Sequence, residues 1–384
     1  MIKILILIDP STEFNRSFLT GLIRYANENH PWIFYRLSPY YKALYGIKGI
    51  LRQIKEWDID AIITQWENEE MDWLKKLNIP VFFQGYKENE DTWFSKISGD
   101  YYTVGAMAAK FFAKRKYQNF AFYGHKDYYW SKGRVEGYRR EIEKIDGNYY
   151  YFESESLNGV PWGNTHNELS EWLASLPKPV ALLACDDYFA LQVSEICQIK
   201  NISIPDELAL MGVDNDQLIC KLSHPSISSI ITDDENGGYN TGKALHKLII
   251  EKNNKPFDIV INPISIELRQ STEKYNILNQ HILKVINYIE EHVTSDISIE
   301  ELTGIVPLAR RNLEIKFKNE TGVAIYQFIL DRKIEYISHL LLTTDKNLKE
   351  IAFSAGYGAV RSLCRIFKKN TGYTPYIFRK KVRP

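Results

Sequence analysis

The chain has few of the residues that build disulfide-rich or metal-binding proteins. Its 384 residues include four Cys, at positions 185, 197, 220 and 364, and eight His. The Cys are too scattered for a disulfide framework or a zinc ribbon, and the His lack metal-ligand spacing. Free cysteines are typical of a reducing compartment, so we expect a cytoplasmic protein with no bound metal.

Long apolar runs are also missing. The first short apolar run, at 2–8, ends at Asp9 and Pro10. It is well short of the roughly 20 residues needed to span a bilayer. It lacks a cleavage-site pattern, so it indicates a buried strand rather than a signal peptide. We therefore expect no contact with a membrane.

Common catalytic and nucleotide-binding motifs do not occur. There is no H-E-x-x-H, no G-x-S-x-G and no Cys-His cluster, and neither G-x-G-x-x-G nor a Walker A lysine follows the first strand. We predict that the protein is not an enzyme and uses no cofactor. His125, His166 and His224 are expected in loops or at the surface.

Charge is balanced overall but unevenly distributed. The chain has 48 Lys+Arg and 48 Asp+Glu. From Ile277 to the C-terminal end there are 17 Lys+Arg and 11 Asp+Glu, so this part carries +6 and residues 1–276 carry −6. A basic segment of this kind suggests a nucleic-acid partner, although the excess alone is weak support. The polar run at 269–276 marks the expected boundary.

Residues before this boundary alternate between short apolar runs and amphipathic stretches. Fully apolar strands separated by helices predict parallel sheets covered on both faces. Roughly 270 residues are too many for one small sheet, so we predict two doubly wound α/β lobes. The predicted strands are 2–8, 61–64, 81–84, 120–123, 180–184, 208–213 and 259–261, and the predicted helices are 17–29, 103–114, 134–144, 165–175, 190–200 and 236–252.

After the boundary, helical periodicity replaces the strand signals. The predicted helices are 281–292, 298–305, 309–320, 324–342, 348–354, 359–369 and 375–381. Ser298 and Glu301 form a capping box that begins a short helix, and Pro307 breaks the chain before a second one. Leu313 and Phe317 are four residues apart and share a face that should be buried. A short helix, a turn and a longer helix with a basic outer face are typical of a helix-turn-helix.

The same pattern recurs about 50 residues later. Ile351 and Ala352 belong to a first helix, Gly356 to the turn, and Leu363 and Phe367 repeat the buried pair of the second helix. The long helix at 324–342 joins the two copies. Two copies at this spacing are a far more specific signal than one.

The double pattern resembles the DNA-binding domain of AraC/XylS-type transcription regulators. The resemblance covers about 100 residues and rests on 332–341 in the joining helix, Gly356-Tyr357, 367–369 and the closing string 371–376. It implies that the second helix of each copy enters a major groove of double-stranded DNA. The residues expected to contact DNA are Arg310, Arg311, Glu314, Val360, Arg361, Arg365 and Lys368.

The chemistry of these side chains fits that role. Arg can donate two hydrogen bonds to guanine or bind phosphate, and the two kinds of contact remain equally open for each Arg. Glu314 can accept from cytosine N4. The sequence departs from the family pattern at Pro307 in the first turn, and at Ala309 and Ala359, which stand where capping residues are common.

Polar side chains follow four predicted strands of the α/β part, in segments 9–16, 123–134, 184–187 and 211–215. Ligands of open α/β sheets bind at the carboxyl ends of strands, so we expect these segments to line one cleft. Carboxylates accept hydrogen bonds from vicinal hydroxyls, Arg donates to oxygens, and Trp stacks on C–H faces. A neutral polyhydroxyl ligand suits this set.

These segments resemble the effector domain of LacI/GalR-type regulators and related sugar-binding periplasmic proteins, over roughly residues 1–270. The strings 99–105, 121–124, 204–215 and 227–230 carry the resemblance. The helix-turn-helix that precedes this domain in that family has no counterpart ahead of the strand at 2–8. The resemblance implies sugar contacts from Asn15, Arg16, Trp130, Arg134, Asp186, Asp214 and Asn215.

Each of these contacts also has a structural alternative. Arg16 could pair at the start of its helix, Asp186 could be a helix N-cap, and Trp130 could be rim packing. Four strand ends that meet in one cleft nevertheless favour the functional reading.

An α/β sugar domain in front of a double helix-turn-helix resembles bacterial regulators of xylose operons. It implies a homodimeric activator that responds to D-xylose and works with RNA polymerase. The alternatives are another sugar such as arabinose or a xylo-oligosaccharide, a repressor, a sugar-active enzyme with a DNA-binding domain, and a constitutive DNA-binding protein.

We divide the chain into an effector domain (1–270), a linker with a linker helix (271–292) and a DNA-binding domain (293–384).

Overall fold

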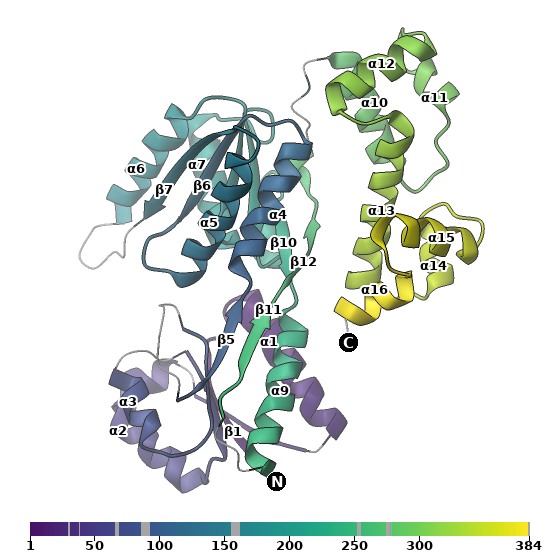
Figure 1. Ribbon diagram of the computed structural model, residues 1–384. Coiled ribbons are helices and arrows are strands. Elements are labelled where there is room, and N and C mark those ends of the chain that lie inside the picture. The colour runs from purple at the N-terminus through teal and green to yellow at the C-terminus, as the bar shows by residue number, and fades with distance from the viewer. Residues whose placement is uncertain are drawn as a thin grey trace.

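The computed structural model describes residues 1–29, 31–37, 39–65, 69–85, 93–154, 162–251, 255–273, 277 and 279–382. These residues form two α/β lobes, one above the other in Figure 1, and a helical domain beside the upper lobe. Each lobe contains one six-stranded sheet, and the described part of the third domain is all helical. The predicted fold class is confirmed.

The first lobe is a parallel sheet covered by helices on both faces. Its strand order is β11 (Asp258–Ile261), β5 (Ser95–Gly99), β4 (Val81–Phe83), β3 (Ala61–Thr64), β1 (Lys3–Leu7) and β2 (Ile33–Arg36), and its helices are α1 (Glu13–Asn29), α2 (Pro39–Trp57), α3 (Glu69–Lys75) and α9 (Asp234–Glu251). Ile4 and Ile6 of β1 pack with α1 and α9, while Leu5 and Leu7 pack with α2 and α3. Burial on both faces explains why every residue of this strand after Lys3 is apolar.

The second lobe has the same construction with one antiparallel strand. Its strand order is β12 (Pro263–Glu267), β10 (Ser228–Thr232), β9 (Leu208–Val213), β8 (Val180–Ala184), β6 (Asn119–His125) and β7 (Asn148–Ser154), and its helices are α4 (Tyr101–Lys114), α5 (Tyr129–Glu143), α6 (Trp162–Ser175), α7 (Asp187–Lys200) and α8 (Gln217–Leu222). β12 runs antiparallel to β10, and the other pairs are parallel.

Within the described ranges, the chain passes between the lobes three times. It crosses at Asp100 between β5 and α4, at Asp233 between β10 and α9, and at Asn262 between β11 and β12. The crossings are hydrogen-bonded to each other: the Asp233 amide donates to the Asn262 carbonyl at 2.9 Å, and the Asp100 amide donates to Ile261 at 2.8 Å. Three adjacent connections of this kind form a hinge about which the lobes can rotate.

Glycines allow α4 and α5 to cross at very close range. A Cβ added at Gly105 would lie 1.9 Å from the Arg134 carbonyl oxygen, and one added at Gly137 would lie 1.9 Å from the Tyr102 carbonyl oxygen. Both neighbours are backbone atoms, so neither can move aside without shifting a helix.

We expect Gly105→Ala to lower the free energy of unfolding by about 3 kcal/mol, because the two helices must separate. Gly304→Ala is the control, since a Cβ there meets nothing within 4 Å, and it should be neutral or stabilising by up to ~1 kcal/mol. Urea unfolding of the full chain measures both. Equal effects of the two changes would contradict the close crossing.

The helical domain consists of two helix-turn-helix units with separate cores. The first contains α10 (Gln280–Glu291), α11 (Ile299–Gly304) and α12 (Arg310–Thr321), the second contains α14 (Leu348–Ser354), α15 (Val360–Thr371) and α16 (Pro375–Val382), and α13 (Ile325–Thr343) joins them. The predicted core residues Leu313, Phe317, Leu363 and Phe367 are all fully buried, which confirms the reading of both helices. The predicted capping box at Ser298 is formed, and a second one, which the sequence analysis did not name, is formed by Asn347 and Glu350.

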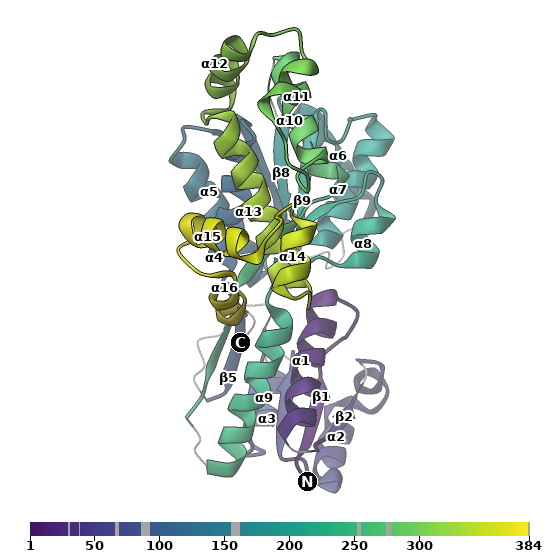
Figure 2. The same cartoon turned by 90° about the vertical axis from the view of Figure 1, so that its right-hand side faces the viewer.

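One helix belongs to both cores. α13 contributes Phe328 to the first core and Ile337 to the second. It therefore fixes the distance and angle between the two units (Figure 2). α10, which the sequence assigned to the linker, packs into the first core through Ile282 and Val285. Within the described ranges no helix has both the length and the hydropathy needed to cross a membrane.

Candidate functional site

A buried arginine lies at the centre of the junction between the lobes. Arg134 on α5 is 4% exposed. Its guanidinium donates to the Cys185 carbonyl oxygen and, at 3.1 Å, to Asp214 Oδ1, while the Tyr101 ring lies 5.6 Å away. Arg134 Nε has no hydrogen-bond partner among the described residues. A buried donor in this state can be satisfied by a ligand oxygen.

Three carboxylates surround this arginine. Asp214 follows β9 with φ of 93°, a left-handed conformation that turns the chain sharply at the strand end. Asp186 caps α7 by accepting from the Phe189 amide at 2.9 Å, so its N-cap role is realised and one of its oxygens is engaged. Burial and the charge of Asp214 raise the pKa of Asp186 to about 6.

Asp234 is a site residue that the sequence reading missed. It opens α9 at the second crossing, is 3% exposed, and its Oδ1 has no hydrogen-bond partner among the described residues. Burial, with the nearby charge of Asp214, raises the pKa of Asp234 well above its usual range. The signal was present in the run Thr-Asp-Asp after 228–231, but those acids read equally well as ordinary helix N-terminal residues.

Asn15 and Arg16 come from the first lobe. Asn15 is 2% exposed, and its amide group is held between the Asp9 carbonyl at 2.6 Å and Gln65 at 3.3 Å. Arg16 pairs with Glu13 at 3.0 Å, as the structural alternative supposed, and also reaches across to Asp216 of the second lobe at 2.8 Å. This ion pair joins the two lobes directly.

Trp130 stands at the end of an aromatic stack. Its ring lies on Tyr128 at 4.6 Å, and Tyr128 lies on His125 at 3.8 Å. His125 is the last residue of β6 and is 7% exposed, so the prediction that it lies in a loop or at the surface is wrong. Burial lowers the pKa of His125, which favours the neutral ring.

Asn215 is turned away from Arg134 by its own contacts. It has φ of 55°, and its Oδ1 accepts from Arg269 at 2.6 Å. Asp187, buried beside it, accepts from the Asp216 amide and the Ser229 hydroxyl, both at 2.6 Å. These bonds hold the loop that presents Asp214. The structure thus brings Arg134, Asp186 and Asp214 together, while Asn215 supports the loop.

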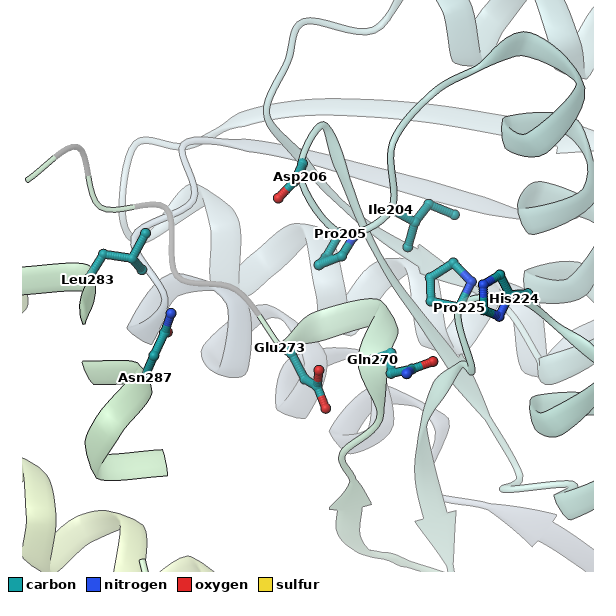
Figure 3. A pocket seen from close by; sticks show the side chains of 9 residues that line it. All are labelled: Ile204, Pro205, Asp206, His224, Pro225, Gln270, Glu273, Leu283 and Asn287. Atoms are coloured by element: carbon teal, nitrogen blue, oxygen red, sulfur yellow. The ribbon is translucent and has the colours of Figure 1, made fainter. Parts of the chain in front are cut away.

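A separate cavity of 590 Å³ lies between the second lobe and α10 (Figure 3). Figure 3 shows Leu283 and Asn287 on one side and Pro205 and Pro225 on the other. It is far more open than a sugar site requires, and Arg134 and its carboxylates do not line it. We therefore assign no effector to it.

Opposite charges on the outer face of α12 partly neutralise each other. Arg310 is bound at 3.1 Å to Glu314 and at 3.3 Å to Glu300 on α11, while Arg311 is exposed. The helix begins at Ala309 without a side-chain cap. Two of the three DNA contacts predicted here are thus already engaged with each other.

The outer face of α15 is more strongly basic. Arg361, Arg365 and Lys368 are exposed and form no ion pair with any described residue. Val360, predicted on the outer face, is half-buried and packs on the second core. α15 also begins without a side-chain cap, at Ala359. Its free cations make it the stronger of the two helices in attracting phosphate.

Two family models match the chain. A periplasmic binding protein-like domain matches residues 109–272, and a helix-turn-helix domain matches residues 302–381. The matched segments lie in the α/β part and in the two helix-turn-helix units, respectively.

Relatives match nearly the whole chain. The xylose operon regulatory protein of Haemophilus influenzae is 30% identical over 335 residues, which are 85% of this chain and 86% of that protein. The protein of the same name from Escherichia coli strain K12 is 27% identical over 339 residues, 85% of each. A solved structure of the xylose-binding transcription activator XylR aligns with 98% of this chain and 97% of its own, with a TM-score of 0.60 at 22% identity.

These proteins share both parts of the architecture and are named as regulators, in agreement with the prediction that the chain is not an enzyme. The solved structure supports the fold, and the Haemophilus relative extends the likeness through both domains. The chain belongs to the family of xylose operon regulatory proteins and is a DNA-binding transcription regulator.

Proposed function

We propose that the protein activates xylose-catabolism genes when D-xylose binds between its lobes. One observation carries the site: Arg134 Nε and Asp234 Oδ1, a buried donor and a buried acceptor, both lack partners among the described residues. A sugar hydroxyl both donates and accepts, so one ligand satisfies both groups. The names of the two relatives support D-xylose as the sugar.

The proposed contacts come from both lobes. Arg134, Asp186, Asp214 and Asp234 hold the hydroxyls, and the Trp130 face covers one side of the ring. Asn15 and Arg16 close from the first lobe once Arg16 exchanges Asp216 for the sugar, and Asn215 keeps the loop in place. Sugar that bridges the lobes favours the closed state of the hinge.

The remaining parts of the proposal concern assembly and output. The effector domain comprises residues 1–270. The DNA-binding domain comprises 293–384 together with α10, which the sequence analysis assigned to the linker. We propose a cytoplasmic homodimer that recruits RNA polymerase. Run-off transcription with and without D-xylose distinguishes activation, in which transcript increases, from repression, in which it decreases.

Thermal unfolding with D-xylose, L-arabinose, xylobiose and D-glucose tests the effector. A ligand at 100 times its dissociation constant adds about 2.7 kcal/mol of stability. D-xylose alone should raise the unfolding temperature. A selective rise with another sugar would contradict xylose, and no rise with any would contradict a sugar-responsive site.

Asp234→Asn should separate stability from binding. The unfolding free energy should rise by about 1 kcal/mol, because burial makes the charged form of Asp234 costly and the amide of Asn carries no charge. Affinity for D-xylose should fall at least tenfold, because the acceptor for a hydroxyl is weakened. Calorimetry and urea unfolding measure the two quantities. A variant that loses stability and keeps its sugar affinity would mark Asp234 as purely structural.

A further inference from the structure

Two hinge-crossing elements lead from the effector site to the DNA-binding domain. α4 begins at Tyr101, directly after the crossing at Asp100, and the Tyr101 ring lies 5.6 Å from the Arg134 guanidinium. Thirteen residues later, about 20 Å along a helix, Lys114 Nζ lies 3.6 Å from Glu335 Oε1 of α13. One end of α4 therefore lies beside the site, and the other end contacts the helix that contributes to both helix-turn-helix cores.

The second connection runs along β12. This strand begins directly after the crossing at Asn262 and ends at Glu267, whose Oε2 lies 3.4 Å from His339 Nε2 of α13. α13 packs along β12, and Figures 1 and 2 show the helix running beside the upper lobe. Both contacts meet α13 one helical turn apart, at residues 335 and 339.

The contact is built so that it can be rearranged. A cavity of 750 Å³ separates α4 and β12 from α13, and its polar lining includes Lys114, Glu267, Glu335 and His339. The side chain of Lys114 is 67% exposed, and that of Glu335 is 44% exposed. Glu335 is also bound at 2.6 Å by Arg332 of its own helix. The exposed Lys114–Glu335 pair therefore holds the two bodies weakly, whereas a close-packed interface would resist any change.

We propose that the Lys114–Glu335 and Glu267–His339 pairs form the surface through which the effector domain sets the position of α13, and with it both reading helices. The proposal rests on the proposed sugar-dependent function. Rotation of the lobes about the hinge moves the starts of α4 and β12. The far ends of these two elements then shift α13, which moves as a rigid body. Because α13 contributes to both helical cores, the two reading units change position relative to the effector domain together.

Lys114→Glu tests the surface, because it places a carboxylate against Glu335. Lys144→Glu is the matched control: Lys144 is the C-cap residue of α5, does not line the cavity, and pairs at 2.6 Å with Glu141 of the effector domain. The readout is the coupling ratio, the DNA dissociation constant without D-xylose divided by that with it. We expect Lys114→Glu to reduce this ratio at least threefold with sugar affinity unchanged. Lys144→Glu should keep the wild-type ratio, and adding Glu335→Gln to Lys114→Glu should restore much of it.

A zero-length carbodiimide cross-link gives a second readout in the wild-type chain. Mass spectrometry should find a Lys114–Glu335 cross-link whose yield changes with D-xylose. Absence of this cross-link, a yield indifferent to bound D-xylose, or equal effects of the two charge reversals would overturn the inference. Failure of the wild-type chain to bind any sugar would instead contradict the proposed function.

Discussion

Arg134→Met should abolish sugar binding and destabilise the effector domain. The side chain is 4% exposed and pairs with Asp214 at 3.1 Å. Breaking a buried pair by removing one partner typically costs about 3–5 kcal/mol, because the other charge is left uncompensated. Here Asp186 and Asp234 lie in the same region, so three carboxylates lose their cation. We expect D-xylose affinity to fall more than 100-fold in calorimetry and the unfolding temperature to drop.

A second variant tests the site even if Arg134→Met fails to fold. Asp214→Asn keeps a hydrogen-bond acceptor for Arg134 and should fold, with D-xylose affinity at least tenfold weaker. Arg139→Ala is the control, because Arg139 lies on the same helix α5 and pairs with Glu136 at the surface. It should leave both affinity and unfolding temperature unchanged. Retained sugar binding in Arg134→Met would refute this position for the site.

The second large effect concerns α15. Replacing both Arg361 and Arg365 by Ala should weaken DNA binding by about 1–3 kcal/mol for each Arg, because both are exposed and have no ion pair in the described structure. Each Arg that contacts phosphate should also reduce the slope of log affinity against log salt by about 1. Sugar affinity should be unchanged. Fluorescence anisotropy with an operator fragment, at several salt concentrations, measures affinity and slope.

Arg310→Ala provides the comparison within the same domain. The guanidinium of Arg310 is already bound to Glu300 and Glu314. Removal of Arg310 should therefore weaken the attraction between the protein and DNA only slightly. We expect at most a few-fold loss of affinity and little change in the salt slope. An equal or larger loss from Arg310→Ala would show that α12 dominates the contact with DNA.

The helical domain could be predicted in detail because its signals are local. Capping boxes, the Gly at the second turn and apolar pairs four residues apart all act within one or two turns. Leu363 and Phe367 are fully buried as their spacing required. Val360 was placed outside because position in a helix does not reveal how far a neighbouring core extends, and it is half-buried.

The α/β part was predicted as a class but not as a topology. β1 and β8 are buried on both faces, and their apolar runs predicted them from the sequence. The missed strands are β2, β5, β7, β10 and β12. β2, β7 and β12 lie at sheet edges, where half-exposed residues break the pattern, and β5 and β10 contain Ser residues that interrupt the apolar run. Nothing local encodes the three crossings between the lobes, since the partners of Asp100 and Asp233 are about 160 and 30 residues away in sequence.

The candidate site shows the same limit. Polar residues at strand ends were identifiable, and Arg134 and Asp214 do meet. Asp234 was not singled out, because its importance follows from burial at a crossing rather than from its neighbours in sequence. Asn215 has the expected chemistry, but a hydrogen bond from Arg269 already occupies its Oδ1.

The most direct test of the account is operator-DNA affinity of the full chain, measured by anisotropy with and without saturating D-xylose. Sugar that closes the lobes and reseats α13 should tighten DNA binding severalfold, because both reading units then reach their half-sites together. The same experiment with the Arg134→Met chain should give no change on adding sugar. A wild-type affinity that is identical with and without D-xylose, in a chain shown by calorimetry to bind it, would contradict coupling between the two domains.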